Sequence, residues 1–387
     1  MKTMRYLLIA AAALTATFAF TACDDDSTTE KVVVKTDTVE VEVPSSNWER
    51  YQRLVTEDVK QHKQHDKVIL LVAFGSTWEQ AFNSFDATIE AYKTDTRFAG
   101  YDVFLSYSSA ICINRAAAAE NGVERHYYAP PFWLNAFAAK GVQYQEIVVQ
   151  SLQVIPGEEY TRVINYIKDF ANNSNGDLDD QYLANVTLKL GVPLLQDKTE
   201  DVPEVAKRLN DLYGSKIQDA DKYMLFMGHG NPDSYDTYKA NIRYSELEEE
   251  LQKLNPRYFV GTVDMMDNFK TDVHERMIAA GFTSGTVYCH PLMSIDGDHG
   301  HNDMGGDDCP EGVTTFDQLE ANEEGEVEDC SWKVYFDLAG YTCNDDTQIH
   351  LGLLELESIR DVWMSHTKDA IDGEPLDYYH SAIPEEE

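Results

Sequence analysis

The feature that most constrains the fold is a repeated pattern of strand and turn. Residues 67–76, KVILLVAFGS, align without a gap with residues 222–231, KYMLFMGHGN. A second pair follows in the same order: residues 151–159, SLQVIPGEE, align with residues 291–299, PLMSIDGDH. Because an internal repeat indicates a repeated structural unit, the sequence predicts two halves built on one layout.

From residue 66 on, short apolar runs alternate with amphipathic segments of helix length. Such runs with helices between them are typical of buried parallel strands in β-α-β units. We therefore expect two similar open α/β domains with parallel sheets and an inter-domain cleft, residues 61–205 and 206–387. The expected strands lie within residues 67–76, 101–109, 146–155 and 186–195 of the first domain, and 222–231, 257–266 and 285–295 of the second.

Composition sets the size of the protein and excludes one class of partner. With 387 residues, 43% of them hydrophobic, the chain can fill two ordinary cores. It has 68 acidic against 31 basic residues, a net charge of -37. Phosphate backbones are bound by clustered Lys and Arg. The sequence has no such cluster, so we expect no nucleic-acid partner.

The N-terminus, MKTMRYLLIAAAALTATFAFTAC, resembles a bacterial lipoprotein signal. Two basic residues precede an apolar run too short for an ordinary membrane span, and small residues precede Cys23. We expect residues 1–22 to be removed, Cys23 to carry lipid, and residues 23–60 to form a tether. The result would be an outer-membrane lipoprotein facing the periplasm or the cell surface. An ordinary secretory signal is the alternative, and it also predicts export.

Five further cysteines follow Cys23. Export permits disulfides, and Cys309 and Cys330 bracket one acidic insert, so they are the first candidate pair. The odd number leaves at least one thiol unpaired.

The two halves differ where chemistry is expected. Phe74 aligns with His229, and Glu159 aligns with His299, so the second half carries imidazoles after two of its strands. Open α/β sheets bind ligands at the carboxyl ends of their strands, and Asp264 follows a third strand there. Two imidazoles and one carboxylate suit a borderline divalent ion such as Co²⁺, Fe²⁺, Ni²⁺ or Zn²⁺.

The stretch DGDHGHND, residues 296–303, holds a second histidine, His301. Its glycines favour a loop over a strand, so we do not pair His301 with His299 as ligands of one ion. The aspartates Asp296, Asp298 and Asp303 either orient an imidazole through its second nitrogen or form turns. For Asp303 we favour the turn.

An aromatic segment, residues 125–137 (RHYYAPPFWLNAF), has two interpretations. It is either a core helix that begins at the proline pair, or an apolar wall for a flat ligand that includes Tyr128 and Trp133. Under the second interpretation the substrate-binding residues are Tyr128 and Trp133 together with Phe74, Gly75 and Ser76.

Several motifs together resemble the anaerobic cobalt chelatases, the class II sirohydrochlorin cobaltochelatases. They are VILLVAFGS, VQSLQVIPGEEY, FMGHG, VGTVD, PLMSIDGDHGHNDMGGDD and LGLLELESIRDVWMSHTKDAI, in the order of that family. The resemblance implies a tetrapyrrole bound between two domains, with the metal on His229, His299 and Asp264. Asp264 stands where the family has glutamate, and Glu159 matches its cleft-facing glutamate. The chain departs from the family in its export signal, in residues 121–135 and in the acidic insert.

The resemblance implies a lyase-type chelatase that inserts a divalent metal into a tetrapyrrole or removes it, with His229, Glu159 and His299 as catalytic residues. Co²⁺ is the ion we favour, with Fe²⁺, Ni²⁺ and Zn²⁺ as alternatives. The competing hypothesis is a non-catalytic surface lipoprotein that binds haem or another tetrapyrrole and serves an outer-membrane haem or metal transporter. A metal-binding lipoprotein without a tetrapyrrole is a third.

Overall fold

The computed structural model describes residues 31–36, 39–44, 47–322, 326–327 and 329–378, in two compact units, residues 1–50 and 51–387. In the first unit, strands β1 (Lys31–Thr36) and β2 (Val39–Pro44) form an antiparallel hairpin. The expected signal and the lipid site at Cys23 lie outside the described residues. None of the helices within the described ranges is long and apolar enough to cross a bilayer.

The second unit begins earlier than the expected end of the tether at residue 60. Helix α2 (Asn47–His62) carries Val55 and Val59 into a hydrophobic core, where both are fully buried. Their spacing of four residues places both on one face of the helix. The last part of the expected tether is therefore a packed helix.

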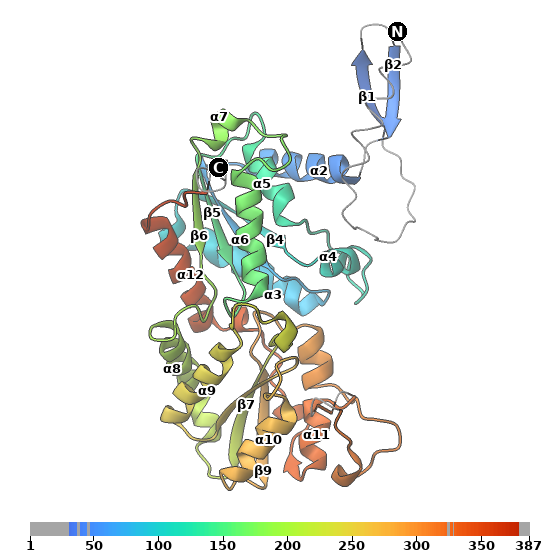
Figure 1. Cartoon of the computed structure of the whole chain (residues 1–387), viewed down its shortest axis with the longest axis vertical. Helices are drawn as coiled ribbons and strands as arrows, with labels where there is room; N and C mark the ends of the chain where they lie inside the picture. Colours follow the sequence, from blue (N-terminus) through green and yellow to red (C-terminus); the bar gives the residue numbers. More distant parts are fainter. Residues whose placement is uncertain (1–30, 37–38, 45–46, 323–325, 328, 379–387) are drawn as a thin grey trace, which may run out of the picture. The chain divides into compact units, whose positions relative to one another are not determined.

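The first sheet of this unit is parallel throughout, with strand order β4-β3-β5-β6 (Figure 1). The strands are β3 (Lys67–Ala73), β4 (Tyr101–Tyr107), β5 (Glu146–Ser151) and β6 (Thr187–Gly191). The helices between them are α3 (Glu79–Thr94), α4 (Ala110–Ala117), α5 (Pro130–Ala138), α6 (Glu158–Ala171) and α7 (Asp180–Leu183).

The second sheet has the same topology, read in chain order, as the first. Its order is β10-β9-β7-β8, so its first strand again lies between its second and third. The strands are β7 (Lys222–Gly228), β8 (Tyr258–Thr262), β9 (Gly285–Pro291) and the short β10 (Tyr341–Thr342), all parallel. The accompanying helices are α8 (Asp201–Tyr213), α9 (Ile242–Leu254), α10 (Lys270–Ala279), α11 (Trp332–Leu338) and α12 (Glu357–Asp372). The predicted α/β class with two parallel sheets is confirmed.

The repeat also holds at the level of strand register. In the first sheet Val72 of β3 pairs with Ser151 of β5, and in the second Met227 of β7 pairs with Pro291 of β9. The sequence alignment places Val72 opposite Met227 and Ser151 opposite Pro291. Equivalent residues therefore stand at equivalent strand ends, which makes the comparison of the two halves a comparison of positions in space.

Alternate residues of the strands fill different cores, as the period of two requires. Ile69, Leu71 and Ala73 of β3 belong to a core that also contains Met224 and Phe226 of β7. The opposite face of β3 packs with α2, α5 and α6, and the opposite face of β7 packs with α10 and α11. The two halves thus share one core and are not independent globules.

The expected boundary at residues 205 and 206 is wrong in two respects. It falls inside α8, which packs against α9 of the second half. The last helix, α12, returns to pack against β5 and β6 of the first sheet (Figure 1). There Trp363 donates its indole N–H to the carbonyl of Gln153, at 3.2 Å, and Lys189 donates to the carbonyl of Ile371, at 3.0 Å. The apolar face of α12 needs the first sheet for its burial.

Candidate metal-transfer site

His229 and Asp264 meet because they follow neighbouring strands. His229 comes directly after β7, and Asp264 is two residues beyond β8. The Asp264 backbone N–H donates to the His229 carbonyl at 2.9 Å, and Oδ2 of Asp264 lies 3.5 Å from Nδ1 of His229. Gly230, with φ of +77°, makes the turn, and a Cβ there would come 2.9 Å from Met265. The predicted pair is therefore brought together by backbone geometry.

His299 joins this pair from the loop after β9. It opens a π-helical turn, His299–Met304, and its ring lies edge-on to that of His229 with centroids 4.6 Å apart. The side chains of His229, Asp264 and His299 are 46%, 38% and 38% exposed. The three predicted ligands are thus adjacent and open to solvent on one side.

Hydrogen bonds orient both rings so that Nε2 remains for a ligand. Nδ1 of His229 lies 2.7 Å from the carbonyl of Gly230, and Nδ1 of His299 lies 2.6 Å from Oδ2 of Asp303. A carboxylate on the second nitrogen is the usual support of a metal-binding imidazole. Our preference for Asp303 as a turn residue was wrong, because the helical turn places residues 299 and 303 on one side.

The two imidazoles differ in their titration. Partial burial and the neighbouring His299 lower the pKa of His229. Burial also opposes protonation of His299, but the hydrogen bond and charge of Asp303, with those of Asp264 and Asp298, outweigh it and raise its pKa. Metal binding requires neutral imidazole, so His229 is ready to bind at lower pH than His299.

Glu159 lies in the first half, at the start of α6. Thr237 donates its backbone N–H to Glu158 at 2.6 Å, and Arg162 donates to the hydroxyl of Tyr235 at 3.2 Å. The start of α6 thus contacts the segment that follows His229. Burial raises the pKa of Glu159, although Arg162 at 3.5 Å opposes the shift. Its Oε2 is buried without a hydrogen-bond partner.

The first-half turn Phe74–Ser76 reaches the loop that carries His299 through Ser76. Phe74 is 43% exposed. Gly75 has φ of +119°, and a Cβ there would meet the ring of Tyr107 at 2.5 Å. A Cβ on Gly297 would lie 3.4 Å from Oγ of Ser76. Ser76 therefore adjoins the predicted metal loop, and Phe74 and Gly75 precede it in the same turn.

The aromatic segment is a core helix, as the first of our two interpretations has it. Pro130 opens α5, and Trp133 is only 7% exposed, packed against Phe104 with ring centroids 5.1 Å apart. Tyr128 is half-buried against the same core, on the outer face of the first sheet. The assignment of Trp133 to a substrate-binding wall is therefore wrong, because burial in the core occupies its ring. The assignment of the half-buried Tyr128 stays a prediction.

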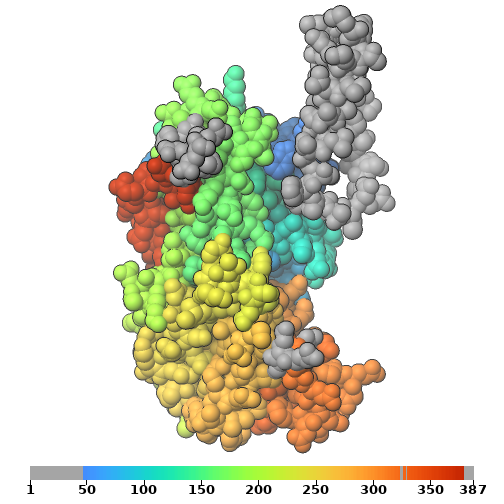
Figure 2. All heavy atoms as spheres, in the orientation of Figure 1, coloured from blue at the N-terminus to red at the C-terminus, as the bar shows by residue number. Residues whose placement is uncertain are grey.

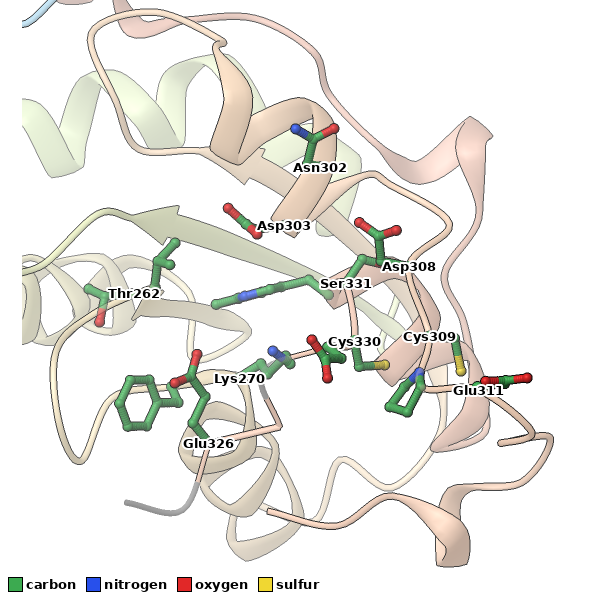
Figure 3. Close-up of a pocket in the computed structure, with 15 residues that line it drawn as sticks. Thr262, Lys270, Asn302, Asp303, Asp308, Cys309, Glu311, Glu326, Cys330 and Ser331 are labelled. Atoms are coloured by element: carbon green, nitrogen blue, oxygen red, sulfur yellow. The ribbon is translucent and has the colours of Figure 1, made fainter. Parts of the chain in front are cut away.

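A pocket of about 420 Å³ lies behind Asp303, within the second half (Figure 3). Residues 309–311, 326, 329 and 330 of the acidic insert close one side of it, and the described part of the insert projects from the second half in the space-filling view (Figure 2). Cys309 and Cys330 both line the pocket and their side chains contact each other. The expected disulfide between them is not formed: all five cysteines of the described region are free thiols.

The sequence analysis missed His350. Its Nδ1 lies 3.0 Å from Oδ2 of Asp296, and its ring stacks on that of His301 with centroids 5.0 Å apart. His350 is 49 residues from His301 and lies in a segment without regular structure. No local pattern joins the two, so only the folded chain reveals the cluster.

The chain is similar to known proteins over most of its length. Residues 67–372 match the family model described as Cobalt chelatase (CbiK). The chain is 26% identical over 311 residues to the sirohydrochlorin cobaltochelatase CbiKC of Nitratidesulfovibrio vulgaris, covering 79% of this chain and 90% of that one. It is 26% identical over 309 residues to the sirohydrochlorin cobaltochelatase of Salmonella typhimurium, covering 79% of this chain and 96% of that one.

Among solved structures, SirB from Bacillus subtilis with Fe³⁺ is similar at 13% identity and a TM-score of 0.45. The similarity covers 80% of this chain and 99% of that one.

Proposed function

This chain belongs to the cobalt chelatase family, and on that premise we propose that it transfers a divalent metal ion to or from a tetrapyrrole at His229, Asp264 and His299. The observation that carries the proposal is the contact of the two imidazoles, 4.6 Å between ring centroids, at strand ends that the repeat makes equivalent to those of Phe74 and Glu159. Two imidazoles and a carboxylate with an exposed side suit an ion that must arrive and leave.

The metal ion is the cargo of the reaction. Nε2 of each imidazole and a carboxylate oxygen of Asp264 hold M²⁺ and leave its other positions open to the macrocycle. As two pyrrole nitrogens bind the ion, their two N–H protons leave, and the imidazoles release it. Glu159, whose pKa burial raises, accepts one proton, and an imidazole freed of metal accepts the other. Removal of a metal is the same sequence in reverse.

For the ion we propose Co²⁺. The family description and the names of the two relatives support this choice. Imidazole and carboxylate donors also bind Fe²⁺, Ni²⁺ and Zn²⁺, which are the alternatives. Asp264 is shorter by one methylene than the glutamate of the resembling family, which sets the ion closer to the backbone of the β8 turn.

For the cellular location we propose an exported lipoprotein of the outer membrane, anchored through Cys23. The N-terminal sequence supports this. Haem or a related exogenous tetrapyrrole is then the accessible substrate. A net charge of -37 also repels the eight carboxylates of sirohydrochlorin more than the two propionates of haem. A tetrapyrrole-binding lipoprotein that serves a haem or metal transporter is the second candidate, and the same observations favour it.

Absorption spectroscopy separates the enzyme from the carrier. The purified protein is mixed with Co²⁺ and sirohydrochlorin, and separately with haem, while the Soret and visible bands are followed over many equivalents of tetrapyrrole. For the enzyme we expect turnover that His229→Ala and His299→Ala abolish. His62→Ala, which removes an exposed imidazole of α2, is the matched control. A Soret shift that stops at one equivalent, with no metal exchange, would instead support the carrier.

A further inference from the structure

A second cluster of metal-binding side chains lies on the other side of the His299 loop. One ligand atom from each of Asp296, His301 and His350 lies within 4.8 Å of the other two. Oδ2 of Asp296 is 3.0 Å from Nδ1 of His350 and 3.7 Å from Nε2 of His301. The rings of His301 and His350 are nearly parallel, at 8°.

The cluster is distinct from the transfer site although both use the same turn. His299 turns toward His229 and Asp303, whereas His301, two residues on, turns toward Asp296 and His350. Within the described ranges, the ligand atoms of the transfer site are not grouped as tightly as those of this cluster. An open site suits cargo, and a compact one suits an ion that stays bound.

Only one oxygen of the Asp296 carboxylate, Oδ2, has a hydrogen-bond partner among the described residues, and that partner is Nδ1 of His350. The residue is fully buried, and its Oδ1 has no hydrogen-bond partner; Nε2 of His301 is also buried without one. A buried carboxylate is costly unless a cation or several hydrogen bonds compensate it. A divalent cation held by Asp296, His301 and His350 would supply this compensation and give the unpartnered Oδ1 and Nε2 atoms a ligand.

Two glycines shape the space around these groups. A Cβ on Gly300 would come 1.7 Å from Oδ1 of Asp296, and a Cβ on Gly305 would come 2.7 Å from Cε1 of His350. Any side chain at either position would displace a member of the cluster. The backbone is thus fitted closely around Asp296 and His350.

We propose that Asp296, His301 and His350 bind a second divalent transition-metal ion that remains with the protein. One carboxylate and two imidazoles are the ligand types of Zn²⁺, and of Co²⁺, Ni²⁺ or Fe²⁺. The proposal does not depend on the proposed function, because it uses none of the ligands of the transfer site.

The position of the cluster gives this ion a role in joining the halves. Trp78, just before α3 of the first half, stacks on His301 with centroids 3.9 Å apart and donates its indole N–H to Asp298 at 2.5 Å. Gln80 of α3 donates to the carbonyl of His350 at 2.6 Å. A bound ion therefore holds the loop that carries His299 against the first half.

The test counts metal in protein that lacks the transfer site. Protein carrying His229→Ala and His299→Ala is stripped with a chelator, dialysed against Zn²⁺ or Co²⁺, and analysed for bound metal. We expect one equivalent to remain, with a Co²⁺ absorption spectrum of nitrogen and oxygen ligands. Adding His350→Gln or Asp296→Asn weakens it by at least about tenfold, whereas adding His62→Gln does not.

Thermal unfolding with and without Zn²⁺ is the second measurement, because binding to the folded state alone raises Tm. Zn²⁺ raises Tm in the double variant and does so less when His350→Gln is added. His350 is partly exposed and asparagine has the shape of aspartate, so these substitutions preserve packing. If the double variant retains no metal, or if its metal is unaffected by His350→Gln and Asp296→Asn, a protonated imidazole compensates Asp296 and the proposal fails. Neither result affects the transfer function.

Discussion

His299 and Asp303 stand one helical turn apart, and Oδ2 of Asp303 lies 2.6 Å from Nδ1 of His299. The carboxylate orients the ring and also raises its pKa. It therefore affects metal binding in two opposite ways: it strengthens the ligand, and it lets protons compete with the metal up to a higher pH.

Asp303→Asn separates these effects, because the amide oxygen still accepts the hydrogen bond but carries no charge. We expect Co²⁺ affinity at pH 8 to fall by about tenfold. Without the carboxylate the pKa of His299 falls, so the loss of Co²⁺ affinity on acidification should begin at a lower pH. Titrations with Co²⁺ between pH 5 and pH 8 measure both. A loss of affinity at an unchanged pH would mean that His299 is not the ligand that titrates there.

Asp264 provides a test of the carboxylate ligand. Asp264→Ala should weaken Co²⁺ binding by at least about tenfold. Loss of a residue that only hydrogen-bonds to a metal ligand already has an effect of that size. Asp264→Glu restores the residue of the resembling family, and we expect it to bind Co²⁺ more tightly than the native chain. Calorimetry measures both. Asp233→Ala, an exposed carboxylate a few residues after His229, is the control and should bind like the native protein.

His290 predicts a dependence of stability on pH. It is fully buried in β9, and burial lowers its pKa to about 4, against 6.5 for a free imidazole. In the unfolded chain His290 therefore becomes protonated below pH 6.5, whereas in the folded chain it becomes protonated only below about pH 4. Above pH 6.5 His290 has no effect on the free energy of unfolding. Below that pH it destabilises the folded state, and the loss of unfolding free energy grows to about 2 kcal/mol at pH 5.

Denaturant unfolding with a chelator present, at pH 7.5 and pH 5, measures this loss. In His290→Asn the side-chain N–H replaces that of Nδ1 toward the carbonyl of Pro291, but the group does not titrate. The variant should lose about 2 kcal/mol less than the native protein between the two pH values. Equal losses would assign the pH dependence to other groups.

Phe74 and Trp133 should behave in opposite ways. Phe74 is exposed two residues before Ser76, which adjoins the loop of His299, so Phe74→Ala should weaken tetrapyrrole binding and change stability by less than about 1 kcal/mol. Trp133 is buried, so Trp133→Ala should cost about 3–5 kcal/mol of unfolding free energy. Its effect on tetrapyrrole binding should be small while the protein is folded. Spectroscopic titration and denaturant unfolding of both variants make the comparison.

The repeat is the reason that so much of the fold and the site follows from the sequence. The ungapped alignment of the two halves made His229 and His299 equivalent to Phe74 and Glu159 from the sequence alone, and the equal strand register of the two sheets agrees with it. Asp264 followed from the rule that parallel strands end at one edge of a sheet.

What the sequence did not reveal depends on contacts between distant segments. The turn that joins Asp303 to His299 is π-helical, and a glycine-rich sequence does not predict that conformation. His350 reaches Asp296 only through the folding of a segment without regular structure. Trp133 was assigned to the wrong role for a similar reason. The local sequence of an aromatic residue near prolines is the same whether its ring lines a ligand site or packs in a core.

The return of α12 to the first sheet also orders the events of folding. Leu376 donates its backbone N–H to the carbonyl of Leu188 at 2.8 Å, so the end of the described chain continues the edge of a strand formed some 190 residues earlier. β5 and β6 therefore lack part of their cover until almost the whole chain has been synthesised. The first half therefore cannot be completed while the last helix is still on the ribosome.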